Sequence, residues 1–470
     1  MAGAGSVRRG DGRRRLWSLL VAGALALGLA AAPGRPTGAE PMELDAENLL
    51  RLAILMIDQG RPREALGMAE ALLARDPEDS GVLALKSRAE RDLGLNDAAV
   101  GSARGAWAAA DNAGQRYDAA MAMAQGLASD GQKFRAQFWL RRAMQAAPDP
   151  AAKKVAERDF AYVRTRSRLW LRFDASIRPS NNVNNGSSSD ILWFYGLPLV
   201  LSGDAQALSG TEGTFGASLR YRLAETEVAK TDLTVSALGR RVALSGEAKA
   251  QAPGARGSDY AYTALEVGLD RTWRPAGLPG AEARATLTLG HDWYAGDPMS
   301  NYLRLETSLS KPVTPKLAFS GSLALERQDR LDSAIRSADI WTLGFGMTTL
   351  TGAKDRIGLG LSFRDTASDS PEIDHQRLRL DLDWTRREPV MGARLALGLW
   401  AEMKDYSLSR YSPDGRLDEG VGAELSLAFE KVDYMGFIPV VTLSGSRTRS
   451  NISLYDSQSL GVGFSIRSKF

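Results

Sequence analysis

The sequence predicts an α + β chain of two domains, with helical repeats ahead of a transmembrane antiparallel β-barrel of about fourteen strands. Glycine and alanine recur at intervals of 34 and 37 residues in the front half. From Leu169 onward the spacing of apolar residues changes from a helical period of about 3.6 to a strand period of about 2. After residue 40 no run approaches about 18 apolar residues, so no spanning helix is predicted. The predicted boundaries are 1–39 for a signal peptide, 40–166 for the helical domain and 167–470 for the barrel.

The first 39 residues have the pattern of an export signal. A basic stretch precedes the apolar run 16–32, and small residues follow it, so cleavage after Ala39 or near Ala32 is expected. A membrane anchor is the alternative reading. It is disfavoured because a run of 17 apolar residues is marginal for a span and three prolines follow closely.

Charge and cysteine content exclude several function classes. The segment 1–39 holds six arginines and one aspartate, a net charge of +5, whereas the whole chain carries +3. The mature protein is therefore about −2, which gives no support for nucleic-acid binding. The absence of cysteine excludes disulfides, thiol catalysis, cysteine metal sites and a lipid anchor on an N-terminal cysteine.

The front half contains a repeat near 46–79, 80–116 and 117–150, followed by a capping helix over 151–166. The middle repeat is three residues longer, an excess that we place around Asp111 to Arg116. A period of 34 residues with a glycine at the turn, a small residue in the second helix and a closing proline resembles the tetratricopeptide repeat. The recurring positions are Gly60, Gly94 and Gly131, then Ala65, Ala99 and Ala136, with Pro77 and Pro148 at the ends.

Such repeats stack their helices around a shared core and leave a concave groove. We therefore expect the helical domain to bind a protein or peptide. A passive spacer in front of the barrel is the alternative reading.

The back half alternates polar and apolar residues for about 300 residues. An even strand count and a length sufficient to cross a bilayer are typical of bacterial barrels. Gaps after odd strands are mostly long and gaps after even strands mostly short, as expected for outer loops and periplasmic turns. The strands centre near Phe173, Leu219, Val235, Leu265, Leu287, Leu305, Leu323, Phe345, Leu361, Leu380, Leu397, Leu425, Leu443 and Phe464.

The polar residues of these strands alternate with the apolar ones and so share one face, which carries charges of both signs. This face predicts a hydrated lumen of mixed charge rather than a filter for one ion sign. Aromatic residues near the strand ends are expected in interfacial belts, and they include Trp273, Trp293, Tyr302, Trp341, Trp384, Trp400 and Tyr406. The lumen candidates are Arg220, Arg222, Arg304, Glu306, Arg379 and Asp381.

Two segments stand out as candidate sites. The last strand places Phe464, Ile466 and Phe470 on one parity, and a terminal aromatic in this phase resembles the signal read by the barrel insertion machinery. The segment 191–201 is apolar but contains Gly196 and Pro198, which disfavour a regular spanning strand. It is predicted to be a plug or gate carrying Trp193, Phe194, Tyr195 and Pro198, to contact cargo, or to form an extra strand.

A signal peptide, a short repeat stack and a fourteen-stranded barrel ending in phenylalanine together resemble the surface lipoprotein assembly modifier family. The more specific segments are PSNNVNNGSSSD (179–190), GLPLVLSGDAQALSG (196–210) and RTRSNISLYDSQSLGVGFSIRSKF (447–470). The resemblance implies that the barrel passes partner proteins across the outer membrane while periplasmic repeats engage the cargo. No motif of cargo-contacting residues matches, so no individual contact residue is carried over.

No enzymatic chemistry is predicted. The two histidines, His291 and His375, have no nucleophile motif beside them, and neither a phosphate loop nor a metal-ligand spacing occurs. The expected partners are a cargo protein, either a lipoprotein or a secreted protein, the barrel insertion machinery and outer-membrane lipid, with no cofactor and no nucleic acid. The alternatives to a protein translocator in the outer membrane are a polysaccharide export porin and a general porin with a scaffold domain.

Overall fold

The computed structural model describes residues 45–194 and 196–468. The predicted signal peptide, Tyr195 and Phe470 lie outside these residues. Within them, no helix combines the length and apolarity that crossing a membrane requires.

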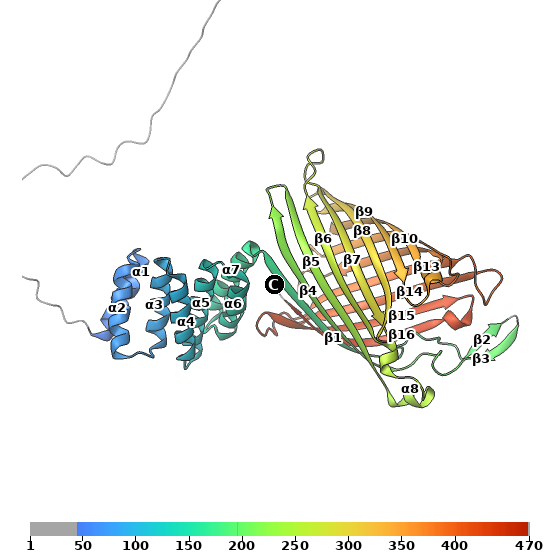
Figure 1. Cartoon of the computed structure of the whole chain (residues 1–470), viewed down its shortest axis with the longest axis horizontal. Coiled ribbons are helices and arrows are strands. Elements are labelled where there is room, and N and C mark those ends of the chain that lie inside the picture. Colours follow the sequence, from blue (N-terminus) through green and yellow to red (C-terminus); the bar gives the residue numbers. More distant parts are fainter. Residues whose placement is uncertain (1–44, 195, 469–470) are drawn as a thin grey trace, which may run out of the picture. The chain divides into compact units, whose positions relative to one another are not determined.

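The helical domain consists of seven helices in the described residues, as three pairs and a final single helix (Figure 1). They are α1 (Ala46–Asp58), α2 (Pro62–Arg75), α3 (Ser80–Asp92), α4 (Asn96–Ala108), α5 (Ala113–Ser129), α6 (Lys133–Ala146) and α7 (Pro150–Arg166).

These helices begin in two different ways, either after a capping side chain or after a glycine turn. Asp79, Asn112 and Asp149 each accept hydrogen bonds from backbone N–H groups of the helix that follows, and so cap α3, α5 and α7. The helices α2, α4 and α6 instead begin just after a glycine turn. Gly60, Gly94 and Gly131 have φ angles of 74°, 79° and 80°, a conformation that only glycine adopts without strain.

Small side chains hold the helix pairs together. Ala65, Ala99 and Ala136 are fully buried, which lets neighbouring backbones approach closely. Their burial matches the predicted repeat. The extra residues of the middle repeat lie where we expected: the loops before α3 and α5 are equally long, and, counted back from the turns at Gly94 and Gly131, α5 exceeds α3 by residues 113–116 at its start, with 17 residues against 13. The insertion therefore adds about one helical turn.

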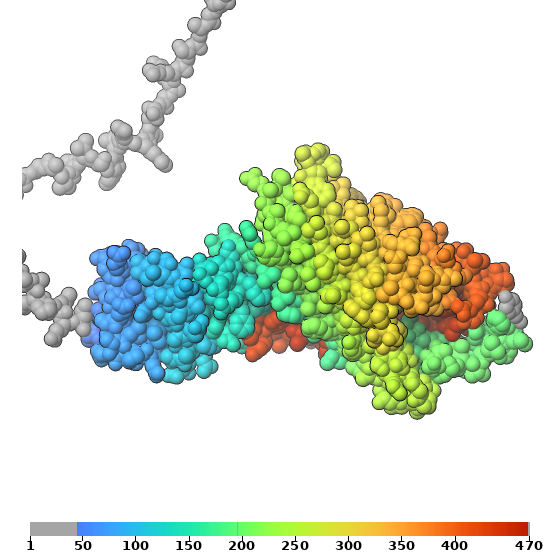
Figure 2. Space-filling view, in the orientation of Figure 1, coloured from blue at the N-terminus to red at the C-terminus, as the bar shows by residue number. Residues whose placement is uncertain are grey.

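A closed antiparallel barrel of fourteen strands follows, which confirms the predicted fold class. Each strand pairs with its neighbours in chain order, and the last strand pairs with the first (Figure 1). In the space-filling view the colours of the visible barrel wall accordingly run in chain order from green through yellow to orange (Figure 2). The barrel strands are β1 (Leu169–Ser180), β4 (Gly210–Glu225), β5 (Ala229–Leu244), β6 (Tyr262–Trp273), β7 (Glu282–Tyr294), β8 (Asp297–Thr314), β9 (Leu317–Arg330), β10 (Ala338–Leu350), β11 (Arg356–Ser368), β12 (His375–Thr385), β13 (Arg394–Tyr406), β14 (Arg416–Ala428), β15 (Phe437–Ser450) and β16 (Ser457–Ser468).

The two faces of the strands differ in chemistry. In β8, Leu303 and Leu305 are exposed on the outer face, and between them Arg304 is half-buried on the inner face. Cross-strand partners keep this parity, because Leu305 lies opposite Leu287 and Leu325. The barrel therefore presents an apolar outer surface and a polar inner one.

The two ends of the barrel also differ. At the end where β4 turns into β5, none of the connections in the described residues is longer than eight residues, and α7 leads into β1 at this same short-turn end. At the opposite, long-loop end lie α8 (Gly246–Gln251), η1 (Gly257–Tyr260), η2 (Ala334–Arg336) and η3 (Ser453–Tyr455). The long connections at this end are 181–209 and 245–261, whereas the others have two to nine residues and the shortest is the tight turn at Ala295 and Gly296 between β7 and β8.

Residues 191–201 do not enter the barrel sheet. They form a separate two-stranded hairpin of β2 (Ile191–Phe194) and β3 (Leu197–Val200) at the long-loop end, so the strand count is unaffected. Pro198 is tolerated there because β3 is an edge strand.

Candidate functional site

The lumen candidates lie on the inner parity of their strands, and most are held in ion pairs. Arg379 Nη2 lies 2.8 Å from Asp381 Oδ1, two residues along β12, and Arg379 Nη1 lies 3.3 Å from Glu402 on β13. Arg304 Nε lies 2.6 Å from Glu326 on β9. Glu306 is exposed, and among the described residues no ion pair is found for it. The structure thus brings Arg379 and Asp381 together but leaves Arg304 and Glu306 apart.

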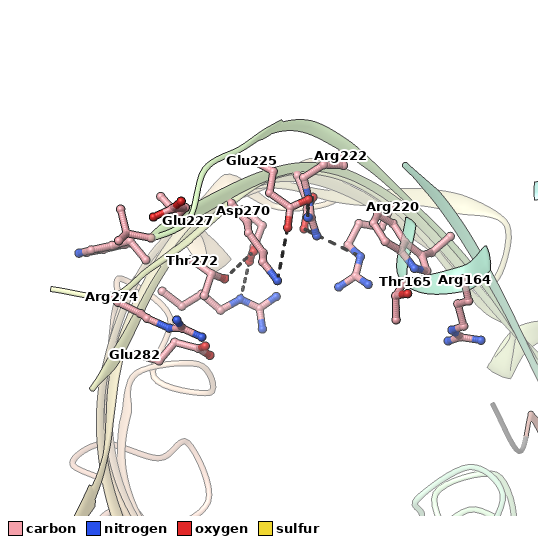
Figure 3. Close-up of a pocket in the computed structure, with 17 residues that line it drawn as sticks. Arg164, Thr165, Arg220, Arg222, Glu225, Glu227, Asp270, Thr272, Arg274 and Glu282 are labelled. Atoms are coloured by element: carbon pink, nitrogen blue, oxygen red, sulfur yellow. Dashed lines mark hydrogen bonds and ion pairs between the residues drawn. The ribbon is translucent and has the colours of Figure 1, made fainter. Parts of the chain in front are cut away.

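Arg220 and Arg222 belong to a pocket of about 520 Å³ at the short-turn end, here called the mouth pocket (Figure 3). Strands β4 to β7 supply most of its wall, Trp170 comes from β1, and the last residues of α7 complete it. Its charged lining residues are Arg164, Arg220, Arg222, Glu225, Glu227, Lys230, Asp232, Asp270, Arg274, Glu282 and Arg284.

Ion pairs fix the centre of the mouth pocket. Arg222 bonds the buried Asp232 and also Glu225, whose Oε2 is 2.7 Å from Arg222 Nη1. On the next strands, Arg284 bonds the buried Asp270. Buried charges such as these are tolerated because each one has a partner of opposite sign.

Trp170 packs against two arginines of the mouth pocket and holds their side chains in place. The guanidinium carbons of Arg220 and Arg222 lie 4.6 Å and 5.0 Å from the centre of its ring. Cation–π contacts of this kind hold long side chains in one arrangement. Trp170 of β1 lies opposite Arg220 of β4, and residues paired across two strands point to the same face of the sheet. Trp170 therefore faces the lumen, as Arg220 does.

Tyr302 and Trp400 correct the sequence prediction of interfacial belts. Tyr302 is only 8% exposed and donates a hydrogen bond of 2.6 Å to Glu266 across the inner wall. Trp400 lies over Gly422, where a Cβ would overlap the indole, and its ring packs against Arg379. Both rings share the parity of charged inner residues. Their even positions in β8 and β13 were the signal that could have placed them in the lumen.

Tyr406 is likewise buried rather than part of a belt. Its ring stacks on His375, and the guanidinium of Arg416 lies 4.1 Å from its centre. Arg416 also lies 3.4 Å from the ring centre of Tyr455 in η3 and pairs with Asp418. This cluster joins three loops at the long-loop end, and sequence reasoning missed it because no local motif marks it.

The predicted gate segment is an exposed hairpin. Trp193 is 59% exposed, and the apolar side chains of β3 are also exposed. Two contacts fix its base: Phe194 packs edge-to-face on Tyr411, and the hydroxyl of Ser453 donates a 2.7 Å hydrogen bond to the Ile191 carbonyl. Tyr195 lies outside the described residues. The hairpin is therefore attached to the long loops, and its gating role stays a prediction.

The predicted assembly signal lies on the outer face of β16. Phe464 and Ile466 are 55% and 57% exposed and lie opposite Ile177 and Ala175 of β1. Phe470 is outside the described residues. The geometry is that of residues facing lipid, and recognition by an insertion machinery stays a prediction.

Both histidines lie in the described part of the chain and are close to neutral oxygen atoms. His291 Nδ1 lies 2.6 Å from Asn301 Oδ1, and His375 Nδ1 lies 2.7 Å from the Ile373 carbonyl. Over residues 45–194 and 196–468, no group of three or more histidine or acidic side chains is arranged to hold a metal ion.

Comparisons with known proteins find distant structural similarity. No protein-family model matches the chain, and no curated protein matches it. The translocator chaperone SycD of Yersinia enterocolitica type III secretion is 19% identical over 26% of this chain and 88% of its own, with a TM-score of 0.23. The outer-membrane channel DcaP of Acinetobacter baumannii is 9% identical over 63% of this chain and 96% of its own, with a TM-score of 0.37. Similarity this distant carries no argument about function, which rests on the geometry.

Proposed function

We propose that this chain is an outer-membrane translocator that moves partner proteins, either surface lipoproteins or secreted soluble proteins, across the membrane. In this proposal the helical repeats lie in the periplasm and recruit the cargo. The chain would then belong to the surface lipoprotein assembly modifier family, as the segments 179–190, 196–210 and 447–470 suggest.

The apolar outer face supports a membrane location. Leucine and phenylalanine side chains are exposed on strand after strand, for example Leu265, Leu305 and Phe345. A soluble protein rarely exposes so continuous an apolar surface, whereas lipid covers it at no cost. In the described residues the sheet is also closed, so that every barrel strand has a neighbour on both sides, as a barrel in a bilayer requires.

The attachment point of the repeats is the observation that carries the proposal. The helix α7 ends at Arg166 and β1 begins at Leu169, at the end of the barrel where the turns are short. Short turns are typical of the periplasmic side of outer-membrane barrels. A stack of repeats, a scaffold that commonly binds proteins, is thus connected to the end of the barrel that we propose faces the periplasm.

The test removes the repeats and keeps the barrel. We expect a chain that lacks residues 40–166 to stay in washed outer membranes but to lose protease-accessible partner proteins from intact cells. Mass spectrometry of peptides shaved from the cell surface measures this loss, and a strain without the whole chain sets the lower limit. Normal surface display without the repeats would contradict the recruiting role.

A polysaccharide export porin stays the second candidate, because three aromatic residues line the inner wall. Trp170, Tyr302 and Trp400 have the stacking surfaces that a sugar conduit uses. However, an arginine covers each ring, and Tyr302 is almost fully buried. Block of single-channel current by maltodextrin would favour this candidate, and unchanged current would favour the translocator.

A further inference from the structure

The mouth pocket has an uneven charge distribution. Arg164 and Arg220 lie on one side of it, and Glu227, Arg274 and Glu282 lie on the other (Figure 3). The charges between the two sides neutralise one another in the ion pairs described above. An incoming ligand therefore meets a positive side and a mixed side.

The two arginines on the positive side are poorly neutralised. Arg220 Nε lies 3.9 Å from the nearer oxygen of Asp232, and Asp232 already bonds Arg222. In the described part of the chain, no carboxylate pairs with the guanidinium of Arg164. Burial lowers the pKa of Arg164, and the neighbouring charge of Arg220 lowers it further. The two like charges thus lie close enough to repel each other.

An anion between two such guanidiniums would relieve this repulsion. Arginine presents paired N–H donors that match the two oxygens of a carboxylate. Trp170 already holds Arg220 in place, so less side-chain entropy is lost when a ligand binds.

We infer that Arg164 and Arg220 form a carboxylate-binding site at the mouth of the lumen, which holds an acidic side chain of the partner polypeptide as it passes from the repeats into the barrel. This inference rests on the proposed function. The connection from α7 into β1 supports a polypeptide as the occupant, because the site lies where the protein-binding scaffold meets the lumen. Glu227 and Glu282 on the far side disfavour a long polyanion.

The test measures binding of a defined probe to the full-length protein in detergent. The probe is a fluorescein-labelled Gly-Ser peptide with two glutamates, and the matched peptide carries glutamines instead. We expect fluorescence anisotropy to show about tenfold tighter binding of the glutamate peptide. The double variant Arg164→Gln/Arg220→Gln should remove this preference, and Arg164→Lys/Arg220→Lys should restore part of it.

A control variant separates the site from general charge. Arg172→Gln changes the charge of the same lumen by the same sign, but Arg172 is exposed and already paired with Asp174. It should leave the preference for glutamate unchanged. The glutamine double variant relieves the repulsion between the two arginines but also loses the contact of Arg220 with Trp170, so its thermal melt should stay close to that of the parent, which excludes misfolding.

Several outcomes would overturn the inference. Equal binding of both peptides would do so, as would an unchanged preference in the glutamine double variant. Competition by polygalacturonate without binding of the glutamate peptide would assign the site to an acidic polysaccharide instead. If surface display needs residues 40–166 but tolerates the double variant, the inference fails and the proposed function stands. If the peptide preference holds but display does not need the repeats, the recruiting role fails alone.

Discussion

Ser176 of β1 lies opposite Ser465 of β16, where the first and last strands close the barrel. Among the described residues, paired positions along this seam run from Ser180 with Gly461 to Ala175 with Ile466. Between β13 and β14, by contrast, they cover the full length of both strands. In the described part of the chain, fewer paired backbone groups hold the closing seam than hold β13 and β14, so we expect the closing seam to separate more easily.

A disulfide across the closing seam should therefore stabilise the barrel. The natural chain has no cysteine, so the double variant Ser176→Cys/Ser465→Cys can form only one intramolecular bond. Opposed residues of antiparallel strands have Cα separations that a disulfide accepts. We expect oxidation to raise the midpoint of thermal unfolding and dithiothreitol to reverse the gain.

The pair Ser308 and Ser322 supplies the control for this experiment. These serines lie opposite each other on β8 and β9, a pair of strands bonded along most of its length. The corresponding cysteine variant should also crosslink but should raise the midpoint less. An equal gain at both positions would show that the closing seam is no weaker than the rest of the sheet.

Gly290 is predicted to be intolerant of a side chain. The Tyr302 ring lies over it, and a Cβ there would overlap the ring atoms. Gly290→Ala should therefore displace Tyr302 from Glu266 and lower the free energy of unfolding by about 1–3 kcal/mol. Gly321→Ala is the matched control, since its Cβ would meet only a carbonyl oxygen at 4.0 Å. Urea unfolding of both variants, followed by tryptophan fluorescence, makes the comparison, and equal stability of the two would contradict it.

Strand position and number could be predicted because each strand has one apolar and one polar face. The alternation around Leu305 was sufficient to place β8, and the same pattern recurs in every barrel strand. The repeats were predictable for a related reason, since Gly94 and Ala99 are needed for a turn and for a close helix contact. These features are local in the sequence.

The features that the sequence could not predict, such as the buried Tyr302 and the mouth pocket, depend on which strand positions lie opposite each other. Tyr302 was assigned to a belt because it lies near a strand end, whereas its position is set by Gly290 on the neighbouring strand. The mouth pocket joins Arg164 of a helix to Arg220 of a strand 56 positions later, and no spacing rule connects the two. Such partners become visible only when the register of the sheet is known.

Two glycines of the repeats should respond to alanine in opposite directions. Gly94 has a φ of 79°, so Gly94→Ala should destabilise the helical domain by about 1 kcal/mol. Gly101 lies on the exposed side of α4 with nothing near its missing Cβ, so Gly101→Ala should stabilise it by about 0.5–1 kcal/mol. Thermal unfolding followed by circular dichroism at the helical minimum measures both. Shifts of the same sign would be inconsistent with the turn geometry.

The hairpin of β2 and β3 offers a direct test of gating. If it restricts the lumen, replacing residues 191–200 by a short Gly-Ser linker should raise the single-channel conductance in planar bilayers, because loops at a barrel mouth control access to the lumen. The variant Phe194→Ala should act in the same direction but more weakly, since it removes the contact with Tyr411 and keeps the rest of the hairpin. Trp193→Ala is the matched control, because Trp193 is largely exposed and its loss leaves the base of the hairpin intact. Unchanged conductance in the linker variant would exclude a gate, and the exposed apolar side chains would then remain as a contact surface for cargo.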